Sequence, residues 1–309
     1  MMIYNFSMKK YLGVDIGGTS IKIASVNKQG KIVDKVKEYQ VKDYPLLVTT
    51  INAIDDYLSK IKDKKLQGIG ISASGLIDNK KGVVVGQAGH VKNYTGSKIK
   101  ETIEKRYKVK TSVINDAKAA ALGEKWIGNA KKYSNSIVLT VGTGIGGGII
   151  VDSKILNGAS GFGGEVGHIS IDIHGEKCYC GNRGCFEYLA STKALIRNIE
   201  NKTNYKNLDG KKVFELIQKQ DKKILKIYDE WLYCLAQGIV SMIHIFNPEA
   251  VIISGGISVQ KTLFIEPLKN KIKELGRKEF INNIEIKSAK LKNNAGLIGA
   301  VYNFLQEDK

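Results

Sequence analysis

The stretch YLGVDIGGTSIKIAS, residues 11–25, is the most informative segment of this 309-residue chain. It is rich in Ile and Val and is interrupted by Gly17 and Gly18. Paired glycines allow a tight turn, so the pattern predicts two β-strands joined as a hairpin.

A second segment repeats this pattern. Residues 136–152, SIVLTVGTGIGGGIIVD, contain an apolar strand, a glycine turn from Gly142 to Gly148 and another apolar run. Such a duplication predicts two lobes around a cleft, each of which offers a glycine turn to the same ligand.

Helical spacing of apolar residues and short apolar runs alternate along the rest of the chain, which predicts an α/β protein. We expect a smaller N-terminal lobe of residues 1–117 plus 292–309 and a larger lobe of residues 118–291 with a cysteine-rich insertion. Helices are expected at residues 48–61, 99–107, 116–126, within 189–199, and at 211–220, 222–246, 263–275 and 295–305, the last packing on the first lobe, and strands at 68–72, 109–114 and 250–254.

The composition, with 43% hydrophobic and 25% charged residues, is that of an ordinary globular protein. No apolar run approaches the roughly 20 residues that cross a bilayer. Residues 1–10 also lack the long apolar stretch of a secretory signal. We therefore expect a cytoplasmic protein without a membrane partner.

The net charge of +18 raises the question of a nucleic-acid partner. The lysines are scattered, however, and no cluster of arginines or interleaved aromatic residues occurs. We therefore expect no nucleic-acid partner, although a positive field would still favour an anionic substrate such as ATP. The only arginines are Arg106, Arg183, Arg197 and Arg277.

The first glycine turn carries groups that suit a nucleotide. Gly17 and Gly18 let backbone amides approach a phosphate, and Thr19 completes the turn. The carboxylate of Asp15 suits Mg²⁺ or its water ligands, and Lys22 adds a positive charge. A plain hairpin with an exposed Asp is the alternative, which the second glycine turn disfavours.

The second turn matches GxGxxG at Gly142, Gly144 and Gly147. A dinucleotide site would need a helix directly after this motif, whereas a β-like run follows here. We therefore interpret GTGIGGG as a second phosphate hairpin for ATP. In this hairpin Gly144 leaves the backbone accessible to a phosphate, and the Thr143 hydroxyl is available to a phosphate oxygen.

Gly255 and Gly256 lie between a buried strand and an expected helix. Their amides are candidates for contact with the nucleotide. Glycines needed only for packing would explain this pair nearly as well.

Asn115 and Asp116 lie where a strand ends and a helix begins. A carboxylate at this place normally caps the first helical turn. The functional alternative is a general base that accepts the proton of an attacking sugar hydroxyl, a role that an Asp of ordinary pKa can fill. The two roles are compatible.

His168 is followed by three cysteines in a compact CxC and Cx4C pattern: Cys178, Cys180 and Cys185. One histidine and three cysteines form a tetrahedral structural Zn²⁺ site. A disulfide is disfavoured because CxC closes a very tight ring. The fourth cysteine, Cys234, lies in an apolar helix and is expected to be an inert core residue.

Two acidic residues flank this zinc-binding insertion. Glu165 precedes His168 by three residues, and Glu187 follows Cys185 by two. Paired carboxylates accept hydrogen bonds from hydroxyl groups and so suit a polyol better than an anion. Solvated surface acids are the alternative. His90, His174 and His244 show no partner pattern and are expected to be ordinary surface or core residues.

The chain resembles the ROK family of bacterial sugar kinases and sugar-responsive repressors over nearly its whole length. The shared motifs are DIGGTSIK at residues 15–22, NDAKAAALGE at 115–124, GTGIGGG, GEVGH at 164–168, CYCGNRGCFE and ISGGI near Gly255. The resemblance implies a two-lobed actin-like (ribonuclease H-like) ATPase fold and a homodimer.

The resemblance also implies the roles of individual residues. Asp116 would be the catalytic base, and ATP with Mg²⁺ would lie between the two glycine hairpins. The residues implied around the sugar are Gly75, through its backbone, together with Asn115, Glu165, His168 and Glu187. Members commonly have Pro before the glycine equivalent to Gly75, where this chain has Ala73 and Ser74, and many have Asn near the position of His90.

Three functions are compatible with this resemblance. The first is ATP-dependent phosphorylation of a hexose, with the 6-hydroxyl as the expected acceptor; glucose, N-acetylmannosamine and the terminal glucose of a β-glucoside all remain open. Repressors of the family carry a helix-turn-helix domain ahead of the first hairpin, which here starts at Tyr11. A sugar-binding protein without catalysis would lack Asp116 or the phosphate turns. We therefore expect the kinase.

Overall fold

The computed structural model describes residues 9–41, 45–61, 65–86 and 93–308. The chain forms two compact units. The first contains Met1–Ile127, Asn157–Gly163 and Asn294–Lys309, and the second contains Gly128–Leu156 and Gly164–Asn293.

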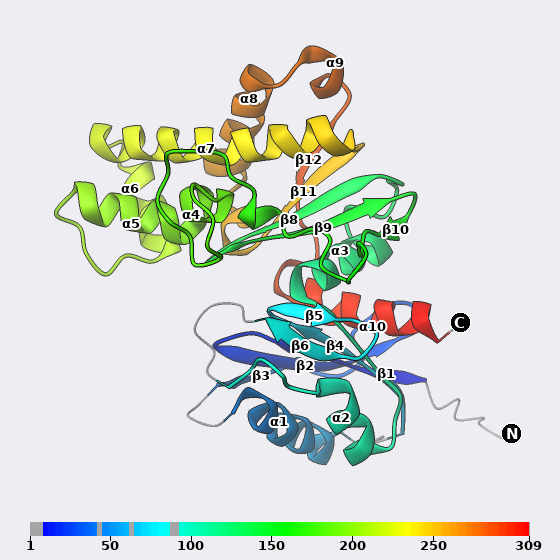
Figure 1. Ribbon diagram of the computed structural model, residues 1–309. Coiled ribbons are helices and arrows are strands. Elements are labelled where there is room, and N and C mark those ends of the chain that lie inside the picture. The colour runs from blue at the N-terminus through cyan, green and yellow to red at the C-terminus, as the bar shows by residue number, and fades with distance from the viewer. Residues whose placement is uncertain (1–8, 42–44, 62–64, 87–92, 309) are drawn as a thin grey trace, which may run out of the picture. The chain divides into compact units, whose positions relative to one another are not determined.

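The first unit is built on a five-stranded sheet in the order β3-β2-β1-β4-β7 (Figure 1). The first three strands are antiparallel, and β4 and β7 run parallel to β1. The strands are β1 (Lys10–Ile16), β2 (Ser20–Asn27), β3 (Lys37–Gln40), β4 (Leu66–Ala73) and β7 (Thr111–Asn115), and a separate ribbon pairs β5 (Leu76–Asp78) with β6 (Val83–Gly86).

Helices cover both faces of this sheet. Figure 1 shows α1 (Leu46–Lys60) and α2 (Ile99–Tyr107) on one face and α10 (Ala295–Glu307) on the other. A Cβ atom at Gly70 of β4 would lie 2.2 Å from the carbonyl oxygen of Ala300, so glycine is what lets α10 lie directly on the sheet. The expected packing of the last helix on the first lobe is confirmed.

The second unit repeats the plan of the first. Its sheet has the order β10-β9-β8-β11-β12, in which β8 and β9 form the hairpin and β11 and β12 are parallel to β8. The strands are β8 (Ser136–Val141), β9 (Ile145–Val151), β10 (Lys154–Ile155), β11 (Ala250–Ser254) and β12 (Glu285–Ser288). The expected duplication of a hairpin-headed α/β unit is confirmed.

The 25-residue helix α7 (Lys222–Phe246) organises the core of this unit, with Trp231 only 1% exposed. The helix expected within residues 189–199 is divided, because Ser191 ends α4 and its Oγ accepts a hydrogen bond from Ala194 N, 3.1 Å away, at the start of α5. The other helical segments are α4 (Phe186–Ala190), α5 (Thr192–Lys202), α6 (Gly210–Gln218), α8 (Glu266–Leu275), α9 (Lys278–Ile281) and the short turns η1 (Val166–His168), η2 (Gly256–Val259), η3 (Lys261–Ile265) and η4 (Lys292–Asn294).

The division into units differs from the expected lobes at α3 (Asp116–Ile127). The whole of α3 belongs to the first unit, so that unit continues to Ile127 instead of ending at 117. The reason is close helix packing: a Cβ atom at Gly299 of α10 would lie 1.6 Å from the carbonyl oxygen of Ala119. The residues from Asn157 to Gly163 join this unit as well, and Asn157 accepts a hydrogen bond of 3.0 Å from Asn79.

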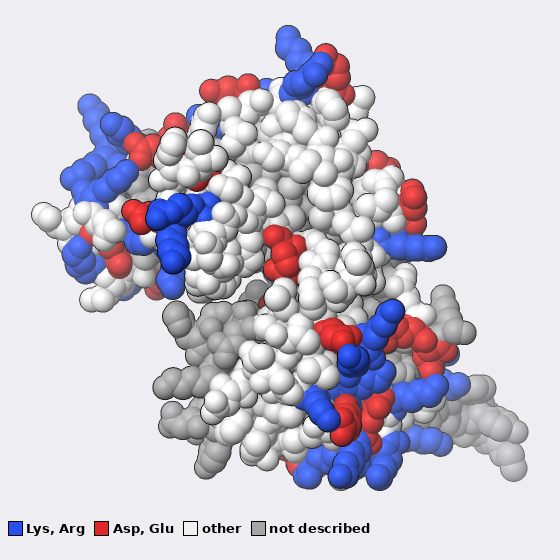
Figure 2. Space-filling model, in the orientation of Figure 1, with Lys and Arg blue, Asp and Glu red and all other residues white. Residues whose placement is uncertain are grey.

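The surface charge is dispersed on the face drawn in Figure 2. Among the described residues there, Lys and Arg lie in several separate groups with Asp and Glu among them, and they form no continuous basic stripe. No helix in the described ranges has both the length and the apolar character needed to span a membrane.

Candidate functional site

The sheet of the first unit collects its candidate site residues at one edge. Strands β1, β4 and β7 are parallel, and the register pairs Ile16 with Ala73 and Ala73 with Asn115. The carboxyl ends of the three strands therefore meet, which is where open α/β sheets bind ligands.

The first glycine turn is a three-residue loop between β1 and β2. Gly17 N donates to the carbonyl oxygen of Ser20 over 3.0 Å, which closes the loop. Gly18 and Thr19 are exposed. The exposed backbone of Gly18 suits contact with a phosphate, and phosphate binding at this turn stays a prediction.

Asp15 lies at the end of β1, opposite Lys22 in the hairpin register. Its Oδ1 accepts a hydrogen bond of 2.6 Å from the hydroxyl of Ser72, which is fully buried in β4. Burial raises the pKa of Asp15, and the Ser72 hydrogen bond and the charge of Lys22 offset part of that rise. A buried carboxylate of this kind gains from a nearby cation, which fits the expected contact with Mg²⁺ or its waters.

The sequence interpretation missed Ser72. The available signal was a polar residue near the carboxyl end of the otherwise apolar strand β4. Gly296, at the start of α10, also belongs to this environment, because a Cβ atom there would lie 2.9 Å from Asp15 Oδ1.

Asn115, not Asp116, supplies the main cap of α3. Asn115 Oδ1 accepts hydrogen bonds from the backbone N atoms of Ala117 (3.0 Å) and Lys118 (3.2 Å). Its Nδ2 donates to the carbonyl oxygen of Gly75 at 3.1 Å and to Asp116 Oδ1 at 3.1 Å. Asn115 therefore ties the turn at Gly75 to the first turn of α3 and orients the carboxylate of its neighbour.

Asp116 is exposed at the first turn of α3, and its Oδ1 accepts a hydrogen bond of 2.8 Å from Ala117 N. Gly75 has φ +95°, a conformation that strongly favours glycine. Tyr94, a residue that the sequence did not single out, is 1% exposed. Burial raises the pKa of Tyr94, and the charge of Asp116 raises it further. His90 lies outside the described residues.

A buried lysine supports the same helix turn. Lys118, two residues after Asp116, is 2% exposed, and its Nζ donates to the carbonyl oxygen of Gly161. The segment from Asn157 to Gly163 is thereby held to α3 within the first unit.

The second glycine turn is also a three-residue loop, between β8 and β9. Gly142 N donates to the carbonyl oxygen of Gly144 over 2.9 Å, and Thr143 is exposed. Glu187 Oε2 accepts a hydrogen bond of 2.9 Å from Ile145 N, the first residue after the turn. A Cβ atom at Gly144 would lie 2.3 Å from this Oε2, so the glycine makes room for the carboxylate.

Gly255 and Gly256 follow β11, which lies beside β8 with Ser254 paired to Thr140. Gly255 has φ +99°, and a Cβ atom there would lie 2.1 Å from the carbonyl oxygen of Val141. Packing therefore accounts for Gly255. Gly256 is exposed, and no atom lies within 4 Å of a Cβ built on it, so packing does not account for this second glycine.

The four expected zinc ligands come together in the second unit. The ligand atoms of His168, Cys178, Cys180 and Cys185 all lie within 4.8 Å of one another. His168 Nδ1 is 3.8 Å from Cys178 Sγ, and the sulfurs of Cys180 and Cys185 are 3.5 Å apart. A tetrahedral Zn²⁺ with Zn–S bonds of about 2.3 Å separates its ligand atoms by about 3.7 Å, so the donor set fits this metal.

The loop that carries the cysteines is tightly folded. Cys178 N donates to the carbonyl oxygen of Asn182 at 2.7 Å, and Gly181 N donates to that of Cys178 at 3.0 Å. A Cβ atom at Gly184 would lie 1.7 Å from the carbonyl oxygen of Asp172. The backbone therefore sets the spacing of the cysteines.

Tyr179, between two of the candidate zinc ligands, was also missed by the sequence interpretation. Its hydroxyl lies 3.2 Å from His168 Nε2. Partial burial of the hydroxyl raises the pKa of Tyr179, and the adjacent carboxylate of Glu187 and the charge of Glu165 raise it further. The two acids and the imidazole expected around a sugar therefore all act on this one hydroxyl.

The remaining cysteine and histidines behave as expected. Cys234 packs partly buried against the core of the second unit, and burial raises the pKa of its thiol, as in unreactive cysteines. The ring of His244 packs edge-on against Phe280 with centroids 5.0 Å apart, and His174 is exposed.

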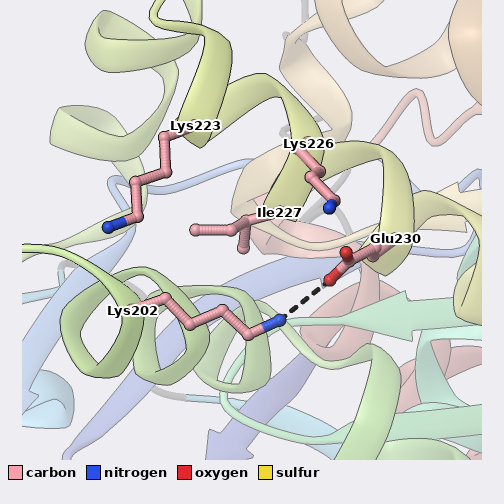
Figure 3. Close-up of a pocket in the computed structure, with 5 residues that line it drawn as sticks. All are labelled: Lys202, Lys223, Lys226, Ile227 and Glu230. Carbon is pink, nitrogen blue, oxygen red and sulfur yellow. Dashed lines mark hydrogen bonds and ion pairs between the residues drawn. The ribbon is translucent and has the colours of Figure 1, made fainter.

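A separate groove of about 450 Å³ lies between α5 and α7 (Figure 3). Its lining residues are Lys202, Lys223, Lys226, Ile227 and Glu230, and Lys202 forms an ion pair of 2.9 Å with Glu230. It includes none of the candidate site residues, so the motifs define the site and this groove does not.

Comparisons with known proteins agree with the motifs. A family profile described as ROK family matches residues 11–307. The glucokinase of Thermotoga maritima is 32% identical over 312 residues, which cover 94% of this chain and 96% of that enzyme. The xylose repressor of Bacillus subtilis is 30% identical over 303 residues, which cover 97% of this chain and 78% of the repressor.

A solved structure is similar throughout. The ROK family glucokinase from Streptomyces griseus, in complex with glucose and AMPPNP, has a TM-score of 0.82 and 29% identity, and the match covers 95% of this chain and 98% of that chain. The expected actin-like α/β fold is thereby confirmed. Because the family match extends from residue 11 to residue 307, this protein belongs to the ROK family.

Proposed function

We propose that this sugar kinase transfers the γ-phosphoryl group of ATP to a hydroxyl of a hexose or N-acetylhexosamine, with the 6-hydroxyl as the acceptor and Asp116 as the general base. The observation that carries the proposal is the hydrogen bond between Glu187 and Ile145 N. This hydrogen bond holds the carboxylate of Glu187, which suits sugar hydroxyls, next to the second glycine turn, which suits phosphate.

The nucleotide would be bound by the two glycine turns. Backbone amides at the exposed residues Gly18, Thr19, Thr143 and Gly256 are the groups that would contact phosphate oxygens. Lys22 supplies positive charge beside Asp15. Mg²⁺ bound to the ATP phosphates would neutralise their charge, and Asp15 is the carboxylate that would hold it or its waters.

The sugar would be bound by Glu165, His168 and Glu187, with Asn115 and the backbone of Gly75 as further contacts. Zn²⁺ would hold the imidazole of His168 by Nδ1, which leaves Nε2 for a sugar hydroxyl. Its role is structural: it fixes the side chains that bind the sugar.

Asp116 has the placement that a base requires. Asn115 orients its carboxylate at 3.1 Å, and the cap that Asn115 forms makes Asp116 dispensable for starting α3. Phosphoryl transfer depends more on positioning than on a strong base, so an oriented carboxylate suffices to accept the hydroxyl proton.

The function is tested by measuring ADP formation with ATP and a panel of hexoses and N-acetylhexosamines. The proposal predicts that at least one sugar stimulates ADP release far above the rate without sugar, with one sugar phosphate formed for each ADP. If no sugar does so while the protein still binds sugar, the protein acts as a sugar sensor, as the repressors of its family do, and the proposal is wrong.

A further inference from the structure

Tyr179 lies at the tip of the turn that carries two zinc ligands. Gly181 N donates to the carbonyl oxygen of Cys178 at 3.0 Å, which makes Tyr179 and Cys180 the central residues of a β-turn. The cysteines on either side fix the backbone of Tyr179, while its side chain as a whole is 65% exposed. The ring therefore does not pack in the core, although the backbone that carries it is held in a tight turn.

The hydroxyl of this exposed ring turns inward. It lies 3.2 Å from His168 Nε2 and also contacts the carboxylate of Glu187, whose Oε2 accepts from Ile145 N at 2.9 Å. The two rings meet edge to face, with centroids 5.2 Å apart and an angle of 87° between their planes. A phenol thus holds the polar groups of this cluster in a defined arrangement.

A phenol hydroxyl and a sugar hydroxyl offer the same hydrogen bonds. Each donates one hydrogen to a carboxylate and pairs through its oxygen with an imidazole nitrogen. The partners of Tyr179 are two of the groups that the proposed function assigns to the sugar. One hydroxyl group can therefore occupy this position at a time.

Resting on the proposed function, we propose that Tyr179 is a specificity-determining residue of the sugar site: its hydroxyl holds the place of one sugar hydroxyl at His168 and Glu187, and a sugar binds by displacing it. A sugar that carries a hydroxyl at that position replaces the lost hydrogen bonds. A sugar that lacks it either leaves Tyr179 in place or leaves polar groups unpaired, and it binds more weakly.

The test compares Tyr179→Phe with the unmodified protein, both loaded with Zn²⁺, by calorimetric titration with glucose and each of its monodeoxy derivatives, or with the best sugar of the panel and its deoxy derivatives. Phe keeps the ring contact with His168 and removes only the hydroxyl. Tyr233→Phe, at a tyrosine of α7 that is 47% exposed, is the matched control.

We expect Tyr179→Phe to bind the parent sugar about two- to tenfold more tightly, because the sugar no longer displaces a hydrogen bond. One deoxy sugar gains nothing from the substitution, and this sugar identifies the hydroxyl that displaces Tyr179. Zinc content and melting temperature stay unchanged.

Weaker sugar binding by Tyr179→Phe would show that the hydroxyl binds the sugar directly, and an equal change for every deoxy sugar would show that no hydroxyl is displaced. Loss of zinc from the variant would show a structural role. Each of these results overturns the inference while leaving the kinase intact. Failure of the unmodified protein to bind any hexose would instead overturn the proposed function, and this inference with it.

Discussion

Asp15, the carboxylate proposed to hold Mg²⁺ or its waters, is buried at a cost in stability. Its carboxylate lies beside the buried hydroxyl of Ser72, and burial raises its pKa. An acid whose pKa is raised in the folded state contributes its full stabilisation at pH values below the pKa that it has in the unfolded state. The free energy of unfolding then falls as the pH rises through the higher pKa of the folded state. At neutral pH the ionised carboxylate therefore lowers the stability of the fold, and a cation bound beside it would offset this cost.

We predict that Asp15→Asn keeps or raises the melting temperature in the absence of nucleotide and lowers kcat/KM for MgATP by at least about a hundredfold, since the neutral amide carries no ionisation penalty and cannot hold Mg²⁺. Thermal melts and steady-state kinetics measure the two effects. A large loss of stability with normal MgATP kinetics would show that Asp15 is structural.

The same carboxylate predicts a pH dependence. As the pH falls toward the raised pKa of Asp15, the carboxylate becomes protonated, so the KM for MgATP should rise at a higher pH than an ordinary Asp would produce. Ser72→Ala removes a hydrogen bond that favours the ionised form and should move this rise to still higher pH. Identical pH profiles for the two proteins would contradict the role assigned to Ser72.

Among the structural elements, the cysteine loop lies next to the groups proposed to bind the sugar. Zn²⁺ at its four ligands would fix His168 and the loop that contains Tyr179, and Glu187 lies only two residues beyond the last ligand. Partners of this kind that orient binding groups are commonly worth about 10- to 100-fold in affinity or activity.

Removal of the metal with a chelator should therefore raise the KM for sugar at least about tenfold and change the KM for ATP much less, because the glycine turns form within strand hairpins. Elemental analysis should find one Zn²⁺ per chain before treatment, and adding Zn²⁺ back should restore the sugar KM. Full activity of a verified metal-free protein would contradict this role for the loop.

The contact between α3 and α10 predicts a second effect, on stability alone. Gly299→Ala would place a methyl group 1.6 Å from the carbonyl oxygen of Ala119, so the helices must separate. We expect a loss of about 2–4 kcal/mol in the free energy of unfolding, measured by denaturant titration. Gly210→Ala is the control, since the nearest atom is 3.7 Å away, and its stability should change by less than about 1 kcal/mol. Equal effects of the two substitutions would argue against tight packing here.

For the molecule as a whole, local sequence patterns predict many structural features. They do not reveal the contacts between residues that are distant in the chain. The two hairpins, the zinc ligands and α7 follow from spacing and composition within single segments. The hydrogen bond from Ser72 to Asp15 joins residues 57 positions apart, and the contact of Lys118 with Gly161 joins residues 43 apart. Neither segment alone reveals its partner.

The same reason explains the assignments that the sequence left open. The cap of α3 depends on the direction in which Asn115 points, and that direction depends on Gly75, 40 residues earlier. Tyr179 lies between two candidate zinc ligands, in a motif that the sequence interpretation used only for its cysteines. Its contact with His168 forms only when the loop folds. The homodimer stays a prediction, and the lobe boundaries expected at 117/118 and 291/292 differ from the unit boundaries that follow Ile127 and Asn293.

The most direct test of the proposed chemistry is sugar-dependent ADP formation by Asp116→Asn at saturating ATP and sugar. Loss of the base should lower kcat by on the order of 10²–10⁴ while sugar affinity, zinc content and stability stay near those of the unmodified protein, because Asn115 still caps α3. Full turnover by Asp116→Asn with normal sugar affinity would contradict the assignment of Asp116 as the base for phosphoryl transfer.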